Sequence, residues 1–93
     1  MNPTDMQTPA DQIGATLIGM ARDCGHEKSF CPSEAARRIA GDHPDQWGPL
    51  MQPVRKAAVQ LALAGRLMIL RKGKPVDPLD FKGVYRLSLP RED

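Results

Sequence analysis

Apolar residues recur at helical spacing in the first quarter of the chain. These positions, three or four residues apart, are Ile13, Leu17, Met20, Ala21 and Cys24. The spacing predicts a helix over residues 9–24 with one apolar face. Thr8 suits its N-cap and Pro9 its first helical position, and Gly25 favours the left-handed conformation that ends many helices.

A second, short helix is predicted downstream. Pro32 and Glu34 mark its start and Gly41 its end. Ser29 and Phe30, just before it, are compatible with a very short strand. Because two helical turns are marginal by themselves, this helix must depend on packing.

A third helix is predicted from Pro49 to Gly65, after a polar turn at residues 42–49 that carries the only tryptophan, Trp47. Pro53 falls in its first turn or so, where proline is tolerated. Its apolar face consists of Leu50, Met51, Val54, Ala58, Leu61 and Ala62. Its exposed candidates are Gln52, Arg55, Lys56, Val59 and Gln60.

Two short strand-like runs follow this helix. Leu67 and Ile69 share a face of the first, and the face of the second consists of Tyr85, Leu87 and Leu89. Between them, residues 72–83 (KGKPVDPLDFKG) form a basic loop that we call the wing. The order of elements predicts an α+β winged helix-turn-helix domain, a three-helix core with a C-terminal β-hairpin wing.

Length and composition indicate a single domain. We expect it to span residues 8–90, with loose tails at 1–7 and 91–93. No run of about 20 apolar residues is present, so no membrane partner is expected. The N-terminal residues carry no Lys or Arg and do not predict a secretory signal, and with only two cysteines we expect a cytoplasmic location.

Charge is unevenly distributed along the chain. Residues 1–48 hold four Lys or Arg against seven Asp or Glu, a net charge of −3, and residues 49–93 hold nine against four, a net charge of +5. A basic C-terminal half indicates an anionic partner, although an ordinary solvated surface is an alternative interpretation.

The third helix occupies the position of a recognition helix, which enters the major groove of DNA. The candidate base readers on it are Gln52, Arg55, Lys56 and Gln60. The candidate phosphate contacts are Arg71, Lys72, Lys74, Lys82, Arg37 and Arg38. Asp77 and Asp80 place acids in the wing and count against phosphate binding, unless they form turn hydrogen bonds.

Several short motifs also resemble one known family. They are Cys31-Pro32-Ser33-Glu34, Trp47, Pro49-Leu50-Met51, Val54-Arg55, Ala64-Gly65-Arg66 and the segment from Gly73 to Pro78. With them the chain resembles a small bacterial winged-helix family catalogued as a domain of unknown function. The resemblance implies the fold and a structural role for Asp77, and it implies no activity.

Neither a metal site nor an active site is predicted. The spacing of Cys24, His26, Cys31 and His43 is not a standard zinc pattern, so we expect no metal and no cofactor. Cys31 stands at the N-cap of the second helix, where a structural role and a redox-sensitive thiol both remain open. No HExxH, GxSxG or phosphate-cradling glycine motif occurs, and we expect no enzymatic activity.

The leading hypothesis is therefore a small winged-helix protein that binds double-stranded DNA, in transcriptional control. The alternative is a winged helix that serves as a protein-interaction module, with another protein or a second copy as partner. A joined basic surface over the third helix and the wing favours DNA. An exposed apolar patch around Val59, Leu63 and Met68 favours a protein partner.

Overall fold

The computed structural model describes residues 10–25 and 27–90. The predicted tails at 1–7 and 91–93, and the predicted helix start at Thr8 and Pro9, lie outside the described residues. The elements in chain order are α1 (Ala10–Cys24), α2 (Pro32–Ala40), α3 (Pro44–Trp47), the 3₁₀ helix η2 (Gly48–Leu50), α4 (Met51–Leu63), β1 (Met68–Arg71), β2 (Lys74–Pro75) and β3 (Arg86–Ser88).

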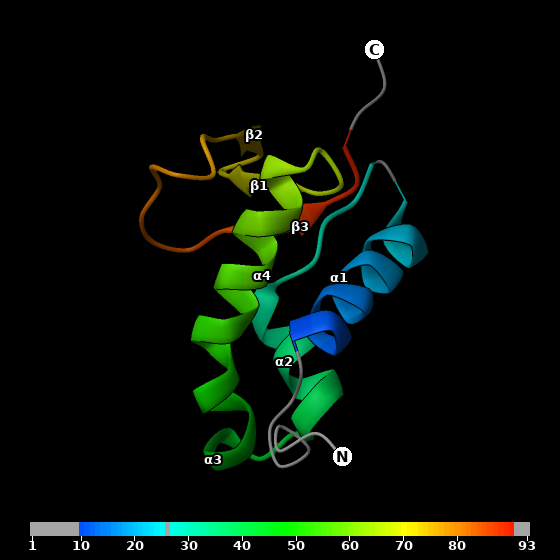
Figure 1. The fold of residues 1–93 in the computed structure, drawn as a ribbon, viewed down its shortest axis with the longest axis vertical. Coiled ribbons are helices and arrows are strands. Elements are labelled where there is room, and N and C mark those ends of the chain that lie inside the picture. The colour runs from blue at the N-terminus through cyan, green and yellow to red at the C-terminus, as the bar shows by residue number, and fades with distance from the viewer. Residues whose placement is uncertain (1–9, 26, 91–93) are drawn as a thin grey trace.

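The helices enclose the core together with the sheet. Helix α4 packs against α1 and α2, and the sheet lies at its C-terminal end (Figure 1). Side chains from all of these layers are at most 1% exposed, among them Leu17, Val54, Ile69 and Leu87. The predicted α+β class is confirmed, and the arrangement is winged-helix-like.

The sheet has three antiparallel strands in the order β2-β1-β3. The predicted two-stranded hairpin was incomplete, because β2 lies inside the segment predicted as a long loop. Lys72 and Gly73 both have positive φ, 53° and 80°, as in the tight type I′ turn that suits the twist of antiparallel strands. The wing therefore begins with a tight turn and only then becomes a loop.

The segment at residues 42–49 was wrongly predicted as a turn without helix. It contains α3 and the start of η2, since Pro44 occupies the first turn of α3, where its missing N–H costs nothing. The α-helix that follows begins at Met51 rather than Pro49. On its predicted apolar face Val54 and Ala58 are fully buried, whereas Leu61 is only partly buried.

The chain between α1 and α2 is anchored to β3. The predicted short strand is a single bridge, in which Phe30 and Leu87 exchange two backbone hydrogen bonds of 2.9 Å. The Ser88 hydroxyl donates to the Lys28 carbonyl at 2.8 Å, and the Arg86 guanidinium donates to Ser29. These contacts join residues 28–30, just before α2, to residues 86–88 of β3, which lie far away in the sequence.

Candidate nucleic-acid interface

The exposed face of α4 presents three of the four predicted base readers. Gln52, Lys56 and Gln60 are all exposed and recur at intervals of four residues, so they form one stripe along the helix. The opposite side of α4 holds Val54 and Ala58 in the core. The exposure of Gln52, Lys56 and Gln60 was predicted correctly. That these residues read bases stays a prediction.

Arg55 was predicted to be exposed, and this prediction is wrong. Its side chain is partly buried and its Nη2 donates to the Phe81 carbonyl at 2.8 Å. The guanidinium carbon lies 3.9 Å from the centre of the Phe81 ring and 5.7 Å from that of Tyr85. Arg55 points to the side of α4 that the wing covers, and Val59, one turn further, is also partly buried. Its guanidinium therefore holds the wing against α4.

Arg55, Phe81 and Tyr85, which we call the Arg55 cluster, form a compact unit. The two rings pack edge to face, with centroids 5.2 Å apart at 69°. Burial raises the pKa of Tyr85 above its ordinary value, and the positive charge of Arg55 opposes that shift. The Tyr85 hydroxyl is buried and has no hydrogen-bond partner among the described residues. The strand periodicity predicted only that Tyr85 shares a face with Leu87 and Leu89. The contact with Arg55 and Phe81 depends on the packing of the wing against α4.

The wing itself carries three exposed lysines. Lys72 and Lys74 stand at the tight turn, and Lys82 lies near the far end of the wing. Arg71, predicted as a fourth phosphate contact here, is instead partly buried and donates through Nη1 to the Lys82 carbonyl. Its guanidinium, like that of Arg55, is engaged within the domain.

Asp77 of the wing has a structural role, as the turn interpretation predicted. Its carboxylate accepts a hydrogen bond from the Leu79 amide at 2.9 Å, and its carbonyl accepts one from the Asp80 amide at 3.0 Å. This Asx turn presents Leu79 to solvent with 73% of its surface exposed. Val84, just after the wing, is 81% exposed.

Arg37 and Arg38 are exposed on α2 but stand apart from the wing. Figure 1 places the last turn of α2 beside α3, at the end of α4 opposite the sheet. On the same helix, Glu34 accepts a hydrogen bond from the Cys31 amide at 2.7 Å and so caps α2. The structure does not bring these two arginines together with the wing lysines.

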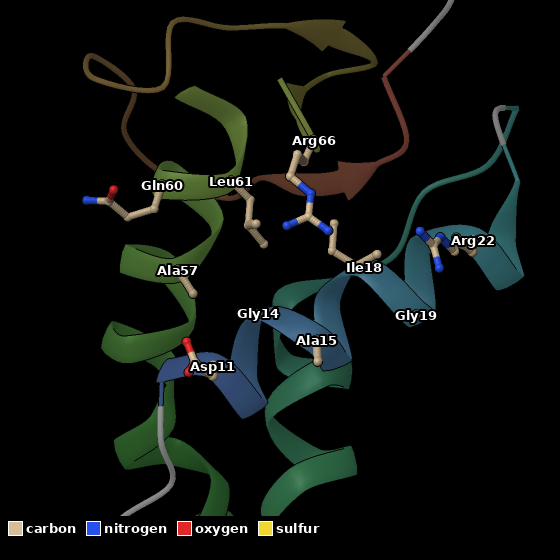
Figure 2. Close-up of a pocket in the computed structure, with 10 residues that line it drawn as sticks. All are labelled: Asp11, Gly14, Ala15, Ile18, Gly19, Arg22, Ala57, Gln60, Leu61 and Arg66. Atoms are coloured by element: carbon tan, nitrogen blue, oxygen red, sulfur yellow. The ribbon is translucent and has the colours of Figure 1, made fainter. Parts of the chain in front are cut away.

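A groove of about 540 Å³ runs beside the contact between α1 and α4 (Figure 2). Its floor and walls include Gly14, Ile18 and Leu61, and Arg22 and Arg66 lie at one end. None of these residues was predicted to form a site. The sequence feature that could have indicated this groove is a second stripe on α1, beside the core stripe, in which small residues are frequent.

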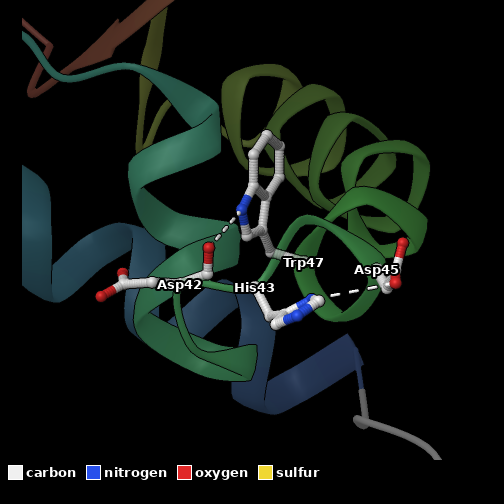
Figure 3. Close-up of polar contacts among 4 residues, drawn as sticks. All are labelled: Asp42, His43, Asp45 and Trp47. Carbon is white, nitrogen blue, oxygen red and sulfur yellow. Dashed lines mark hydrogen bonds and ion pairs between the residues drawn. The ribbon is translucent and has the colours of Figure 1, made fainter.

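The corner between α2 and α4 is held by Trp47 (Figure 3). Its indole Nε1 donates to the Asp42 carbonyl at 3.2 Å, and its partly buried ring packs against the core. The guanidinium of Arg37 lies 5.8 Å from the ring centre. The predicted packing role of Trp47 is confirmed. Nearby, His43 Nδ1 lies 3.9 Å from Asp45 Oδ2 in a solvent-exposed pair.

The cysteines are free thiols. Cys31 is the N-cap residue of α2, as predicted, and its sulfur lies 3.1 Å from the Ser33 hydroxyl. Across residues 10–25 and 27–90, no three His, Cys, Asp or Glu side chains gather as a metal site. His26, the remaining residue of the zinc pattern, lies outside that range.

A family model matches residues 10–90, and its description is protein of unknown function (DUF3253). The match covers most of the chain, so the chain belongs to this family. No curated protein matches it. In the part of the chain that the structure describes, no helix is both long and apolar enough to cross a membrane.

Proposed function

We propose that this chain binds double-stranded DNA through the exposed stripe of α4 and the lysines of the wing. The observation that supports this most is a shared arrangement: Lys56 stands in the stripe, and Lys72, Lys74 and Lys82 follow on the sheet and loop that pack against the same helix. In winged-helix proteins a helix in this position enters the major groove, and a wing beside it contacts phosphates.

The engaged arginines limit the strength of this binding. With Arg55 and Arg71 hydrogen-bonded inside the domain, four exposed cations remain on α4 and the wing. The exposed carboxylates of Asp77 and Asp80 repel phosphates nearby. We therefore propose weak binding, in which Gln52 and Gln60 supply what base preference there is. The proposal includes a cytoplasmic location and a role in transcriptional control.

Fluorescence anisotropy with mixed-sequence duplexes tests this proposal. If four lysines meet phosphates, log affinity should fall against log salt with a slope of about −3.6. Lys74→Ala should weaken all sequences alike and flatten the slope by about one. The matched control is Lys28→Ala, which removes an exposed cation from the loop before α2 and should change nothing.

A second candidate function is protein interaction, and one observation favours it. Among the described residues, the large apolar side chains that remain exposed are Leu63 at 53%, Leu79 at 73% and Val84 at 81%, two of them on or beside the wing. Contiguous exposed apolar surface marks protein-interaction sites. Absence of duplex binding by folded protein at low salt and high micromolar concentration would replace the DNA proposal with this one.

A further inference from the structure

Helix α1 has one face packed in the core and a second face that borders the groove. Its core stripe is buried beneath α2, α4 and the sheet. A second stripe recurs through Asp11, Ala15, Ile18 and Arg22, at intervals of three or four residues, and borders the groove between α1 and α4. Figure 2 shows Leu61 reaching into this groove from α4 while the Gln60 amide points away from it. The bottom of the groove is apolar, formed by Ile18, which is 8% exposed, and by the partly buried Leu61.

Gly19 lines this groove, and no contact among the described residues explains why this position is glycine. A Cβ built on it meets no heavy atom within 4 Å, so packing within the described domain does not require glycine. Glycine is among the least favourable residues inside a helix, and Gly19 lies in the middle of α1. Gly19 is exposed at the edge of the groove, and its missing side chain leaves the backbone there open to close approach by a partner.

Charges at the two ends give the groove a polarity. Arg22, from α1, and Arg66, from the segment before β1, lie at one end, and Asp11 lies at the other (Figure 2). Within the described residues the side chains of all three make no hydrogen bond or ion pair. Since Asp11 and Arg22 are eleven residues apart on one helix, they are separated by about 16 Å along its axis.

We propose that this groove binds an extended segment of a partner protein, about five residues long at about 3.3 Å per residue. The segment carries apolar side chains at its centre, carboxylates at the arginine end and a basic group at the Asp11 end. Guanidinium groups favour carboxylates through bidentate hydrogen bonds. DNA fits this groove poorly, because phosphates gain nothing from an apolar floor and are repelled by Asp11. The proposal does not depend on DNA binding by α4 and the wing.

Fluorescein-labelled hexapeptides test the proposal on the whole chain. Each peptide has an apolar centre with two glutamates at one end and a lysine at the other, synthesised in both chain directions, and a charge-reversed set serves as control. The acidic peptides should bind in one direction and the charge-reversed peptides should not. Arg22→Gln combined with Arg66→Gln should lower the affinity at least about tenfold.

Gly19→Leu gives the sharper test, because it places a large side chain at the edge of the groove while retaining good helix propensity. We expect at least a tenfold loss of peptide affinity with an unchanged circular dichroism spectrum and thermal midpoint no lower than that of the parent. Lys74→Ala, on the wing, should leave peptide affinity unchanged. If Gly19→Leu does not fold, the arginine pair decides the question, since both arginines are exposed.

Three results would overturn the proposal. One is failure of every acidic peptide to bind at about 1 mM. Another is equal binding by the parent and the arginine variants. The third is a loss of duplex affinity in the arginine variants as large as in Lys74→Ala, which would assign the groove to a nucleic-acid surface instead.

Discussion

Replacing Arg55 by methionine is expected to destabilise the fold rather than to change base recognition. The substitution removes the 2.8 Å hydrogen bond to the Phe81 carbonyl and the 3.9 Å contact with the Phe81 ring. A hydrogen bond from a charged group contributes about 1.5–3 kcal/mol, and a partly desolvated cation–π contact about 1–2 kcal/mol. Because Arg55 is only partly buried, and methionine recovers some apolar packing, we expect a net loss of about 2 kcal/mol.

Chemical denaturation measures this loss directly. In a domain of this size, about 2 kcal/mol corresponds to a fall of roughly 10 °C in thermal midpoint. Lys56→Met on the exposed stripe is the matched control and should stay within about 0.5 kcal/mol of the parent. Arg55→Lys retains the charge but loses the planar fork, so it should recover only part of the stability.

A double-mutant cycle between Arg55→Met and Phe81→Leu isolates the ring contact. We expect a coupling energy of about 1 kcal/mol, because Phe81→Leu leaves the backbone carbonyl in place. A coupling near zero, together with unchanged stability of Arg55→Met, would refute the argument. If that variant also lost affinity for a preferred duplex, Arg55 would be the base reader that the sequence alone suggested.

Three further predictions concern the core, the tyrosine and α1. Leu17→Ala, at a fully buried position, should cost about 2–5 kcal/mol in denaturation, against at most about 0.5 kcal/mol for Gln60→Ala. Burial raises the pKa of Tyr85 above 10.0, so the unfolded chain releases this proton first; the tyrosine's contribution to stability is complete below about pH 10 and is lost as pH rises through the folded pKa. Tyr85→Phe should remove that part of the loss of stability at alkaline pH. Because the Tyr85 hydroxyl is buried without a partner among the described residues, the substitution should cost at most about 0.5 kcal/mol at neutral pH. Denaturation curves at about pH 9 and about pH 11 compare the two proteins. Gly19→Ala should raise the free energy of unfolding by about 1 kcal/mol, and a loss of stability would mean that the glycine is needed for packing.

Local patterns in the sequence determined the main elements of this fold. The helical spacing from Ile13 to Cys24 predicted α1 and its end at Cys24, and Pro32 with Glu34 located the start of α2. Such patterns succeed because a helix must turn one apolar face to the core, whatever lies opposite. They failed for β2, since a strand of two residues has no periodicity.

Only the tertiary structure decided which polar residues are free to bind a partner. Arg55 looks like a surface residue from helical spacing, yet its hydrogen-bond partner lies 26 residues away, in the wing. Arg22 and Arg66 lie 44 positions apart in the chain and share one groove. Periodicity assigns a side chain to a face of its own element, but the neighbour across that face depends on how the elements pack, and packing is a property of the whole chain.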